Sequence, residues 1–188
     1  MTVDDFFARL ISALEHSGVP YMITGSYASA AHGIPRATND IDIVIAPTKK
    51  SLVALLREFP DQKYYADELH ALDALERKSQ FNVIDFTTSW KADFIIRKNR
   101  EYSEVEFARR RRHSIAGLSV ELASAEDVLI SKLESAKLGD SERQIEDGAG
   151  IIRRQGDFLD REYVERWVRE LDLEEQWRKA LDRSEATE

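Results

Sequence analysis

The sequence predicts an α+β fold in which helices flank a small β-sheet and a helical layer forms the C-terminal third. Short apolar strands and amphipathic helices alternate over residues 3–59. Two apolar runs, FNVIDF and KADFII, are separated by the polar residues TTSW, which is typical of adjacent antiparallel strands. From residue 124 onward, helix-start signals precede apolar stripes at helical spacing. Together these patterns favour a sheet first and a helical layer after it.

The first part of the chain alternates helix and strand. Residues 3–16 place Phe6, Leu10 and Leu14 on one helical stripe, and Gly18 with Pro20 ends it. We then expect a strand at 21–24, a helix at 26–32, a loop at 33–39, a strand at 40–46 and a helix from 47 to 59, in that order. The polar stretch 61–79 supports no single assignment.

The second part begins with the two strands at 81–86 and 91–96 and continues with a strand or short hairpin around Gly117. Ser124, Ser141 and Asp160 each mark the start of a helix, and a last helix follows with Leu173, Trp177 and Leu181 on one stripe. We therefore expect an α/β core over residues 1–123 and a helical extension over 124–188 that packs on it.

Composition limits the functional classes. The 188 residues contain no cysteine, so disulfides and thiolate metal sites are excluded and a reducing cytoplasm is expected. The N-terminal residues lack the basic start and apolar core of a signal peptide, and no stretch approaches the roughly 20 apolar residues of a membrane span. We expect a soluble protein. Its net charge of -8 disfavours nonspecific binding to nucleic acid.

Two aspartates interrupt the apolar strand at 40–46. Side chains alternate along a strand, so Asp40 and Asp42 face one way, about 7 Å apart, while Ile41 and Ile43 face the other. Two carboxylates forced to about 4 Å repel each other by roughly 4 kcal/mol at an effective dielectric near 20. A divalent cation such as Mg²⁺ relieves that repulsion and prefers oxygen ligands. A lone Asp-x-Asp can equally be a solvated strand end.

Gly25 and Ser26 precede the aspartates and join a strand to a helix. Free backbone N–H groups and a small hydroxyl at such a junction favour a phosphate, although a plain turn glycine and a plain N-cap are alternatives. With the carboxylates, the two elements would suit a magnesium nucleotide.

These residues resemble a known family. Gly-Ser, an alanine-rich helix, His-Gly-x-x-Arg-x-Thr and then Asp-Ile-Asp are similar to the minimal nucleotidyltransferases of the polymerase beta superfamily, and most closely to the group that includes AbiEii-type toxins of toxin–antitoxin systems. The pattern is specific over residues 25–45 and looser to about residue 155. The resemblance implies a mixed small β-sheet of the nucleotidyltransferase type, Mg²⁺ as cofactor and ATP or another nucleoside triphosphate as substrate.

The resemblance also implies a third acid on a nearby strand, which completes the metal site with Asp40 and Asp42 and activates the attacking hydroxyl. Asp85 and Asp93 are the two candidates. Asp85 precedes a turn and has the alternative role of accepting turn N–H groups. We prefer Asp93, a charge in mid-strand that lies in the lysine-x-aspartate strand where this group carries its third acid.

Further positions are assigned to nucleotide binding with open alternatives. Arg36 and Thr38 flank the loop before Asp40 and could instead serve solvation and strand entry. Lys132 could reach a triphosphate or be a surface lysine. Asp147 is implied by the resemblance alone, and it could instead form an ion pair with Arg143. The run Arg109–Arg112 could hold phosphates or be a solvated helix end.

The sequence therefore predicts a cytoplasmic, magnesium-dependent nucleotidyltransferase. It would transfer a nucleoside monophosphate to a hydroxyl on RNA or tRNA, on a protein or on a small molecule such as an aminoglycoside. A toxin–antitoxin role with a cognate antitoxin partner is implied by the resemblance. The alternative is a catalytically silent module that binds a nucleotide or a partner.

Overall fold

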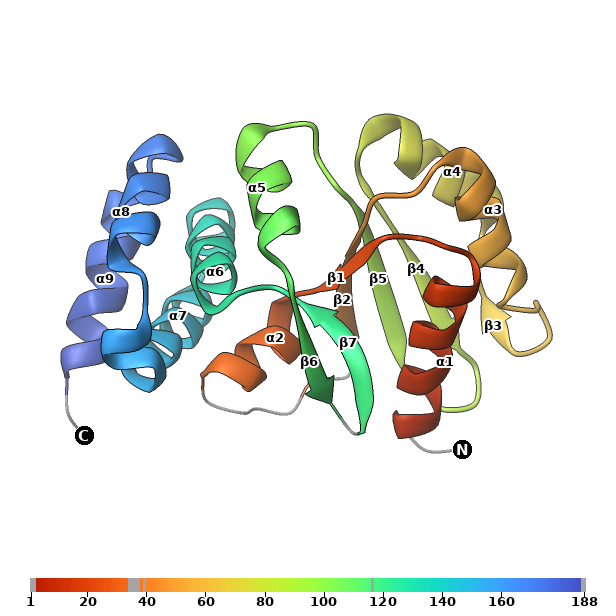
Figure 1. The fold of residues 1–188 in the computed structure, drawn as a ribbon, viewed down its shortest axis with the longest axis horizontal. Coiled ribbons are helices and arrows are strands. Elements are labelled where there is room, and N and C mark those ends of the chain that lie inside the picture. The colour runs from red at the N-terminus through yellow and green to blue at the C-terminus, as the bar shows by residue number, and fades with distance from the viewer. Residues whose placement is uncertain (1–2, 34–37, 39, 116, 187–188) are drawn as a thin grey trace. The chain divides into compact units, whose positions relative to one another are not determined.

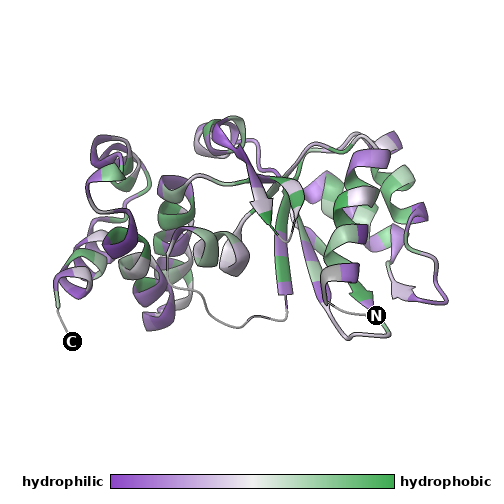
Figure 2. Ribbon diagram, turned by 60° about the horizontal axis from the view of Figure 1, so that its bottom comes forward, coloured by the Kyte–Doolittle hydropathy of each residue, from purple (hydrophilic) through white to green (hydrophobic). Residues whose placement is uncertain are grey.

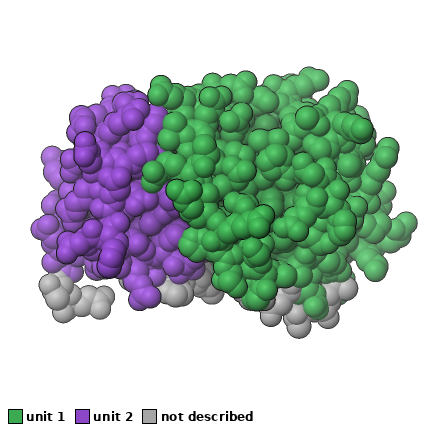
Figure 3. Space-filling model, viewed as in Figure 1, with its two compact units in different colours: residues 1–24, 38–122 green, residues 25–37, 123–188 purple. Residues whose placement is uncertain are grey.

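The computed structural model describes residues 3–33, 38, 40–115 and 117–186. The chain forms two compact units, coloured in Figure 3. Unit 1 comprises residues 1–24 and 38–122, and unit 2 comprises residues 25–37 and 123–188. The chain thus leaves the first unit after Thr24, contributes one helix to the second unit and returns.

Unit 1 contains a seven-stranded mixed sheet with the strand order β3-β4-β5-β2-β1-β7-β6 (Figure 1). β2 runs parallel to β5, β1 runs parallel to β7, and the other neighbours are antiparallel. The strands are β1 (Tyr21–Ile23), β2 (Asp40–Ile45), β3 (Tyr64–Tyr65), β4 (Gln80–Asp85), β5 (Lys91–Ile96), β6 (Arg111–Ile115) and β7 (Leu118–Leu122).

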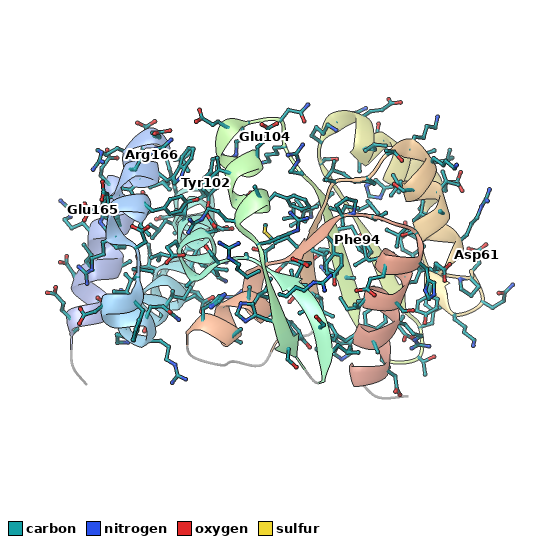
Figure 4. All side chains as sticks on the ribbon, viewed as in Figure 1. Asp61, Phe94, Tyr102, Glu104, Glu165 and Arg166 are labelled. Atoms are coloured by element: carbon teal, nitrogen blue, oxygen red, sulfur yellow. The ribbon has the colours of Figure 1, made fainter. Side chains whose placement is uncertain are left out.

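Among the described residues, unit 1 has four helices, namely α1 (Val3–His16), α3 (Lys49–Arg57), α4 (Glu68–Arg77) and α5 (Glu101–Arg109). Figure 2 shows the mixture of apolar and polar residues along the helices. On α5, Tyr102 is buried and Glu104 is exposed (Figure 4). Aromatic rings join helix to sheet, since Phe6 of α1 stacks on Tyr64 of β3, and within the sheet Phe81 stacks on Phe94. These buried rings form part of the core of unit 1.

Unit 2 is helical. It contains α2 (Gly25–His32), α6 (Ala125–Gly139), α7 (Glu142–Gln155), the 3-10 turn η1 (Gly156–Phe158), α8 (Arg161–Glu170) and α9 (Glu174–Glu185). α6 packs against α7, and α7 packs against α9. Gly148 of α7 allows this close packing, because a Cβ there would lie 3.2 Å from Leu129. His32 ties α2 into the unit through a 2.8 Å hydrogen bond between its Nε2 and the Ala123 carbonyl.

The predicted α+β fold class is confirmed. The helix at 3–16 and the strands at 21–24, 40–46, 81–86 and 91–96 are present within one or two residues of their predicted bounds. The unassigned stretch 61–79 contains β3 and α4. The hairpin around Gly117 is present, but β6 begins at Arg111, inside the arginine run, earlier than the pattern indicated.

Across the described residues, none of the helices combines the length and the apolar character needed to cross a lipid bilayer.

Candidate active site

Asp40 and Asp42 lie on one face of β2. The opposite face carries Ile41, Ile43 and Ile45, each 0% exposed, whereas both aspartates are partly exposed. Burial of the isoleucines therefore fixes the register of the strand and turns both carboxylates to the other side of the sheet.

Parallel pairing places β5 beside them. Asp42 is the direct partner of Asp93, and Asp40 is the direct partner of Lys91. Partners on neighbouring strands lie about 4.8 Å apart and point to the same face. Three carboxylates and one ammonium group thus share one face, with the two strands contributing two residues each.

Asp93 is the most enclosed member of this group, with 7% of its surface exposed. Each of its oxygens has a partner: Asn82 Nδ2 donates to Oδ1 at 3.0 Å, and Lys91 Nζ lies 2.7 Å from Oδ2. Asn82 is also the antiparallel partner of Asp93 on β4. A buried carboxylate needs such partners, because an unpaired charge in the interior is costly.

Lys91 belongs to the cluster although the sequence did not identify it as a site residue. Its hydrogen bond with Asp93 raises the pKa of the Lys91 ammonium group above its ordinary value of 10.5, partial burial opposes this, and the negative charges of Asp93, Asp40 and Asp42 raise it further. The Lys91 ammonium group therefore interacts electrostatically with all three carboxylates. The available signal was its spacing, since Lys91 precedes Asp93 by two residues in a strand and must share its face.

Asp85, the other candidate for the third acid, lies on the opposite face of the sheet, because its neighbour Ile84 is the partner of Lys91. Its carboxylate accepts the Thr87 backbone N–H at 2.7 Å and pairs with Arg9 at 3.2 Å. These contacts stabilise the turn after β4 and join the strand to α1.

The three aspartates suit a hard divalent cation by their chemistry, because they offer carboxylate oxygens on one face and no softer ligand. Within the part of the chain that the structure describes, however, no three Asp, Glu or His side chains already converge as a metal site. The Asp93 oxygens are bound by Asn82 and Lys91. A cation that binds Asp93 therefore meets one of these two groups at the oxygen it approaches, and at Oδ2 it meets the positive charge of Lys91.

The remaining predicted nucleotide-binding residues are distributed over both units. The Thr38 hydroxyl donates to the Asp40 carboxylate, so it orients a cluster member at the entry of β2. Arg36 lies outside the described residues. Gly25 has a φ of +62°, which favours glycine, and with Ser26 it forms the first turn of α2.

Lys132 and Asp147 lie in unit 2 and bind each other. Lys132 Nζ of α6 is 2.8 Å from Asp147 Oδ2 of α7, and the two side chains are 6% and 11% exposed. Lys132 is thus no surface lysine, and the pair joins the two helices.

Two of the four arginines at 109–112 contact neighbouring side chains. Arg110 lies over the Phe107 ring, 4.3 Å from its centroid, and Arg112 pairs with Glu121 at 3.0 Å. These contacts anchor the β6–β7 hairpin and the end of α5.

No protein-family model matches the chain, and no curated protein matches it. Solved structures do resemble it. The antibiotic-resistance factor ANT(2'')-Ia in solution has a TM-score of 0.58 and 14% identity, covering 92% of this chain and 95% of that chain. ANT(2'')-Ia in complex with adenylyl-2''-tobramycin has a TM-score of 0.57 and 17% identity, and the match covers 92% of this chain and 97% of that chain. An antigenic nucleotidyltransferase-like protein from Paracoccidioides brasiliensis has a TM-score of 0.53 and 20% identity, and the match covers 78% of this chain and 74% of that chain.

At these identities the likeness concerns the fold. The chain therefore has the fold of these nucleotidyltransferase-type proteins over most of its length and of theirs.

Proposed function

We propose that the protein is a magnesium-dependent nucleotidyltransferase that transfers a nucleoside monophosphate from a nucleoside triphosphate to a hydroxyl group. The observation that carries this proposal is the parallel register of β2 and β5, which pairs Asp42 with Asp93 and leaves Asp40 on the same face. The shared nucleotidyltransferase fold supports it independently.

Each residue has a role in this reaction. Asp40, Asp42 and Asp93 would hold Mg²⁺, which when bound supplies charge stabilisation at the phosphates. The Asp93 carboxylate accepts the proton of the acceptor hydroxyl. The acceptor oxygen forms its bond to the α-phosphorus as the bond to pyrophosphate breaks. Thr38 orients Asp40 through its hydroxyl.

The residues that bind the nucleotide are assigned from the sequence pattern. The backbone N–H groups of Gly25 and Ser26, at the start of a helix, bind phosphate oxygens. Arg36, Lys132 and Asp147 are assigned to nucleotide binding by the resemblance to the AbiEii-type group. Lys132 and Asp147 also form a buried ion pair with each other, so this assignment gives them a second role, which is to hold α6 to α7.

For the acceptor, a small hydroxylated molecule is the first candidate. Two of the similar structures are ANT(2'')-Ia, one of them with adenylyl-2''-tobramycin, and the net charge of -8 disfavours a polyanionic acceptor. RNA, tRNA or protein acceptors follow from the toxin–antitoxin resemblance, as does a cognate antitoxin. Labelled triphosphates incubated with aminoglycosides, total RNA or total protein separate these classes.

The assignment is tested by Asp42→Asn, which removes one charge and keeps the shape of the side chain. We expect transfer to fall by about 100-fold or more, the size seen when one electrostatic contact to a transition state is removed. Asp61→Asn is the matched control, because Asp61 is exposed and lies after α3, away from β2 in the sequence (Figure 4). Transfer by the Asp42→Asn variant at the wild-type rate would refute the assignment.

The competing function is a silent module that binds a nucleotide or a partner without turnover. Calorimetry with each triphosphate, with and without Mg²⁺, separates the two. Binding that depends on magnesium but yields no labelled product with any acceptor class would favour the silent module.

A further inference from the structure

We propose that Lys91 is a built-in counter-cation of the three-aspartate cluster and that a divalent cation replaces its ammonium group at Asp93 Oδ2. This inference rests on the proposed function only in taking the cluster as a metal site. It assigns a role to a residue that neither the sequence pattern nor the similar folds identified.

The two oxygens of Asp93 are held in different ways. Oδ1 accepts a hydrogen bond from Asn82, a short side chain on the neighbouring strand, at 3.0 Å. Oδ2 is paired with the end of Lys91, a long side chain from the same strand, at 2.7 Å. Asn82 therefore fixes the orientation of the carboxylate, and Lys91 covers the oxygen that remains.

Lys91 is the partner that can leave. Its side chain is 37% exposed, against 11% for Asp93, so its ammonium group can turn into water by rotation of its flexible chain. Asn82 has no comparable path, because its amide must stay beside its own strand. A cation arriving from solvent thus gains access to Oδ2 by exchange with Lys91.

The positive charge of Lys91 has opposite effects on the metal-free cluster and on metal binding. Lys91 interacts with Asp93, Asp40 and Asp42 together, so its single positive charge offsets part of the repulsion among three carboxylates. One ammonium against three carboxylates leaves two negative charges, whereas a divalent cation in its place leaves one, so the metal offsets more of the repulsion than Lys91 does. Lys91 keeps the metal-free cluster tolerable, and the same charge competes with the metal for Asp93.

The consequence is weak binding of a bare metal ion. A cation that arrives alone must displace Lys91 and then share the cluster with a nearby positive charge. A cation that arrives with a triphosphate brings negative charge that offers the released ammonium group a new partner. Lys91 therefore couples metal binding to nucleotide binding.

The experiment compares wild type, Lys91→Met and Lys91→Arg, with Lys98→Met as the matched control because Lys98 is an exposed lysine just after β5. Mn²⁺ and Mg²⁺ are titrated by calorimetry without nucleotide. We expect Lys91→Met to bind Mn²⁺ at least tenfold more tightly than wild type, Lys91→Arg to resemble wild type, and the control to be unchanged. In EDTA, Lys91→Met should melt at a lower temperature than the control, and Mn²⁺ should remove that difference.

A second measurement uses the wild-type protein, so it does not depend on how a variant folds. Lysine acetylation followed by mass spectrometry reports whether the Lys91 amine is free. Mn²⁺ should raise the labelling rate of Lys91 several-fold and leave that of Lys98 unchanged. A Lys91 rate that Mn²⁺ leaves unchanged or lowers overturns the exchange.

The outcomes separate this inference from the proposed function. If Lys91→Met binds Mn²⁺ no more tightly than wild type, or if no protein in the series binds metal, the counter-cation role is wrong even where transfer is active. If the metal displaces Lys91 and no acceptor is ever modified, the counter-cation role stands and nucleotidyl transfer fails.

Discussion

At the scale of single residues, the least expected feature is how completely Asp93 is partnered. A mid-strand aspartate in a sequence suggests a ligand waiting for a cation, but here Asn82 and Lys91 occupy both of its oxygens. Asn82 matters because hydrogen bonds to a charged, enclosed group contribute more than those to exposed ones. Its amide sets the direction in which Oδ2 points.

We predict that Asn82→Ala lowers the free energy of unfolding by about 1.5–3 kcal/mol, since the Asp93 carboxylate loses a hydrogen bond that water can only partly replace. Urea unfolding in EDTA measures this. Gln80→Ala is the control on the same face of β4, because Gln80 is exposed, and its change should stay within about 0.5 kcal/mol. Equal stability of the two variants would mean that the Asn82 amide contributes nothing to holding Asp93.

At the scale of elements, local pattern predicted the strands that bury one face completely. Strand β2 alternates buried isoleucines with aspartates, and β5 buries Ala92, Phe94 and Ile96, so each has a strong period of two. In unit 2, α6, α7 and α8 were predicted from their start signals, and α9 was predicted from its apolar stripe. Asp160, for example, accepts the Tyr163 backbone N–H at 3.0 Å at the start of α8.

The sequence pattern did not predict the elements that bury few or only small side chains. Strand β3 has two residues, and α4 buries only the small side chains Ala71 and Ala74, so neither produces a clear apolar period. Strand β6 starts in the arginine run because it is the edge strand of the sheet, where charged side chains are tolerated and discourage pairing with other chains.

The candidate site was only half predictable for a related reason. The period of two places Asp40 with Asp42 on one face, and Lys91 with Asp93 on one face. Which residue of β2 stands beside which residue of β5 depends on a parallel pairing between distant segments, and local sequence does not encode it. The pairing of Asp42 with Asp93 therefore had to come from the structure.

Elements of unit 2 are joined by a buried carboxylate at the start of α6. Asp127 is 1% exposed, and it accepts hydrogen bonds from the Ser124 hydroxyl at 2.7 Å and from the Tyr163 hydroxyl of α8 at 2.6 Å. The Tyr163 contact is therefore one link between α6 and α8.

We predict that Tyr163→Phe destabilises the protein by about 1.5–3 kcal/mol, because it leaves a buried charge short of one donor while the ring remains. Tyr65→Phe, at a tyrosine that is 43% exposed, provides the same chemical change without that partner and should alter stability by less than about 0.5 kcal/mol. Thermal and urea unfolding of both variants check the difference. A Tyr163→Phe protein as stable as wild type would show that water replaces the hydroxyl.

At the scale of the whole molecule, the residues that we propose for the reaction come from both compact units. The sheet with its three aspartates belongs to unit 1, whereas Gly25, Ser26, Lys132 and Asp147 belong to unit 2. A sequence read from left to right does not predict that residues 25–37 cluster with residues 123–188, because that grouping depends on contacts between distant segments, such as the one from Gln155 to the His32 carbonyl at 2.8 Å.

Burial decides what each ion pair contributes to this architecture. Lys132–Asp147 at 2.8 Å and Lys179–Glu175 at 2.9 Å have nearly the same length. The first pair is 6% and 11% exposed, and the second is 42% and 61% exposed. Removing one member of the buried pair strands a charge in the interior, while removing one member of the surface pair leaves a charge in water.

We therefore predict that Lys132→Met costs about 3–5 kcal/mol of stability, whereas Lys179→Met costs less than about 1 kcal/mol. The double variant Lys132→Met/Asp147→Leu should recover most of the loss, because it removes both charges together and keeps the volume between α6 and α7 filled. Urea unfolding of the four proteins measures these differences. If the double variant is as unstable as Lys132→Met, the loss comes from packing and not from a stranded charge. A stable double variant also permits a clean measurement of triphosphate affinity, and a marked loss of affinity there would support the assignment of Lys132 and Asp147 to nucleotide binding.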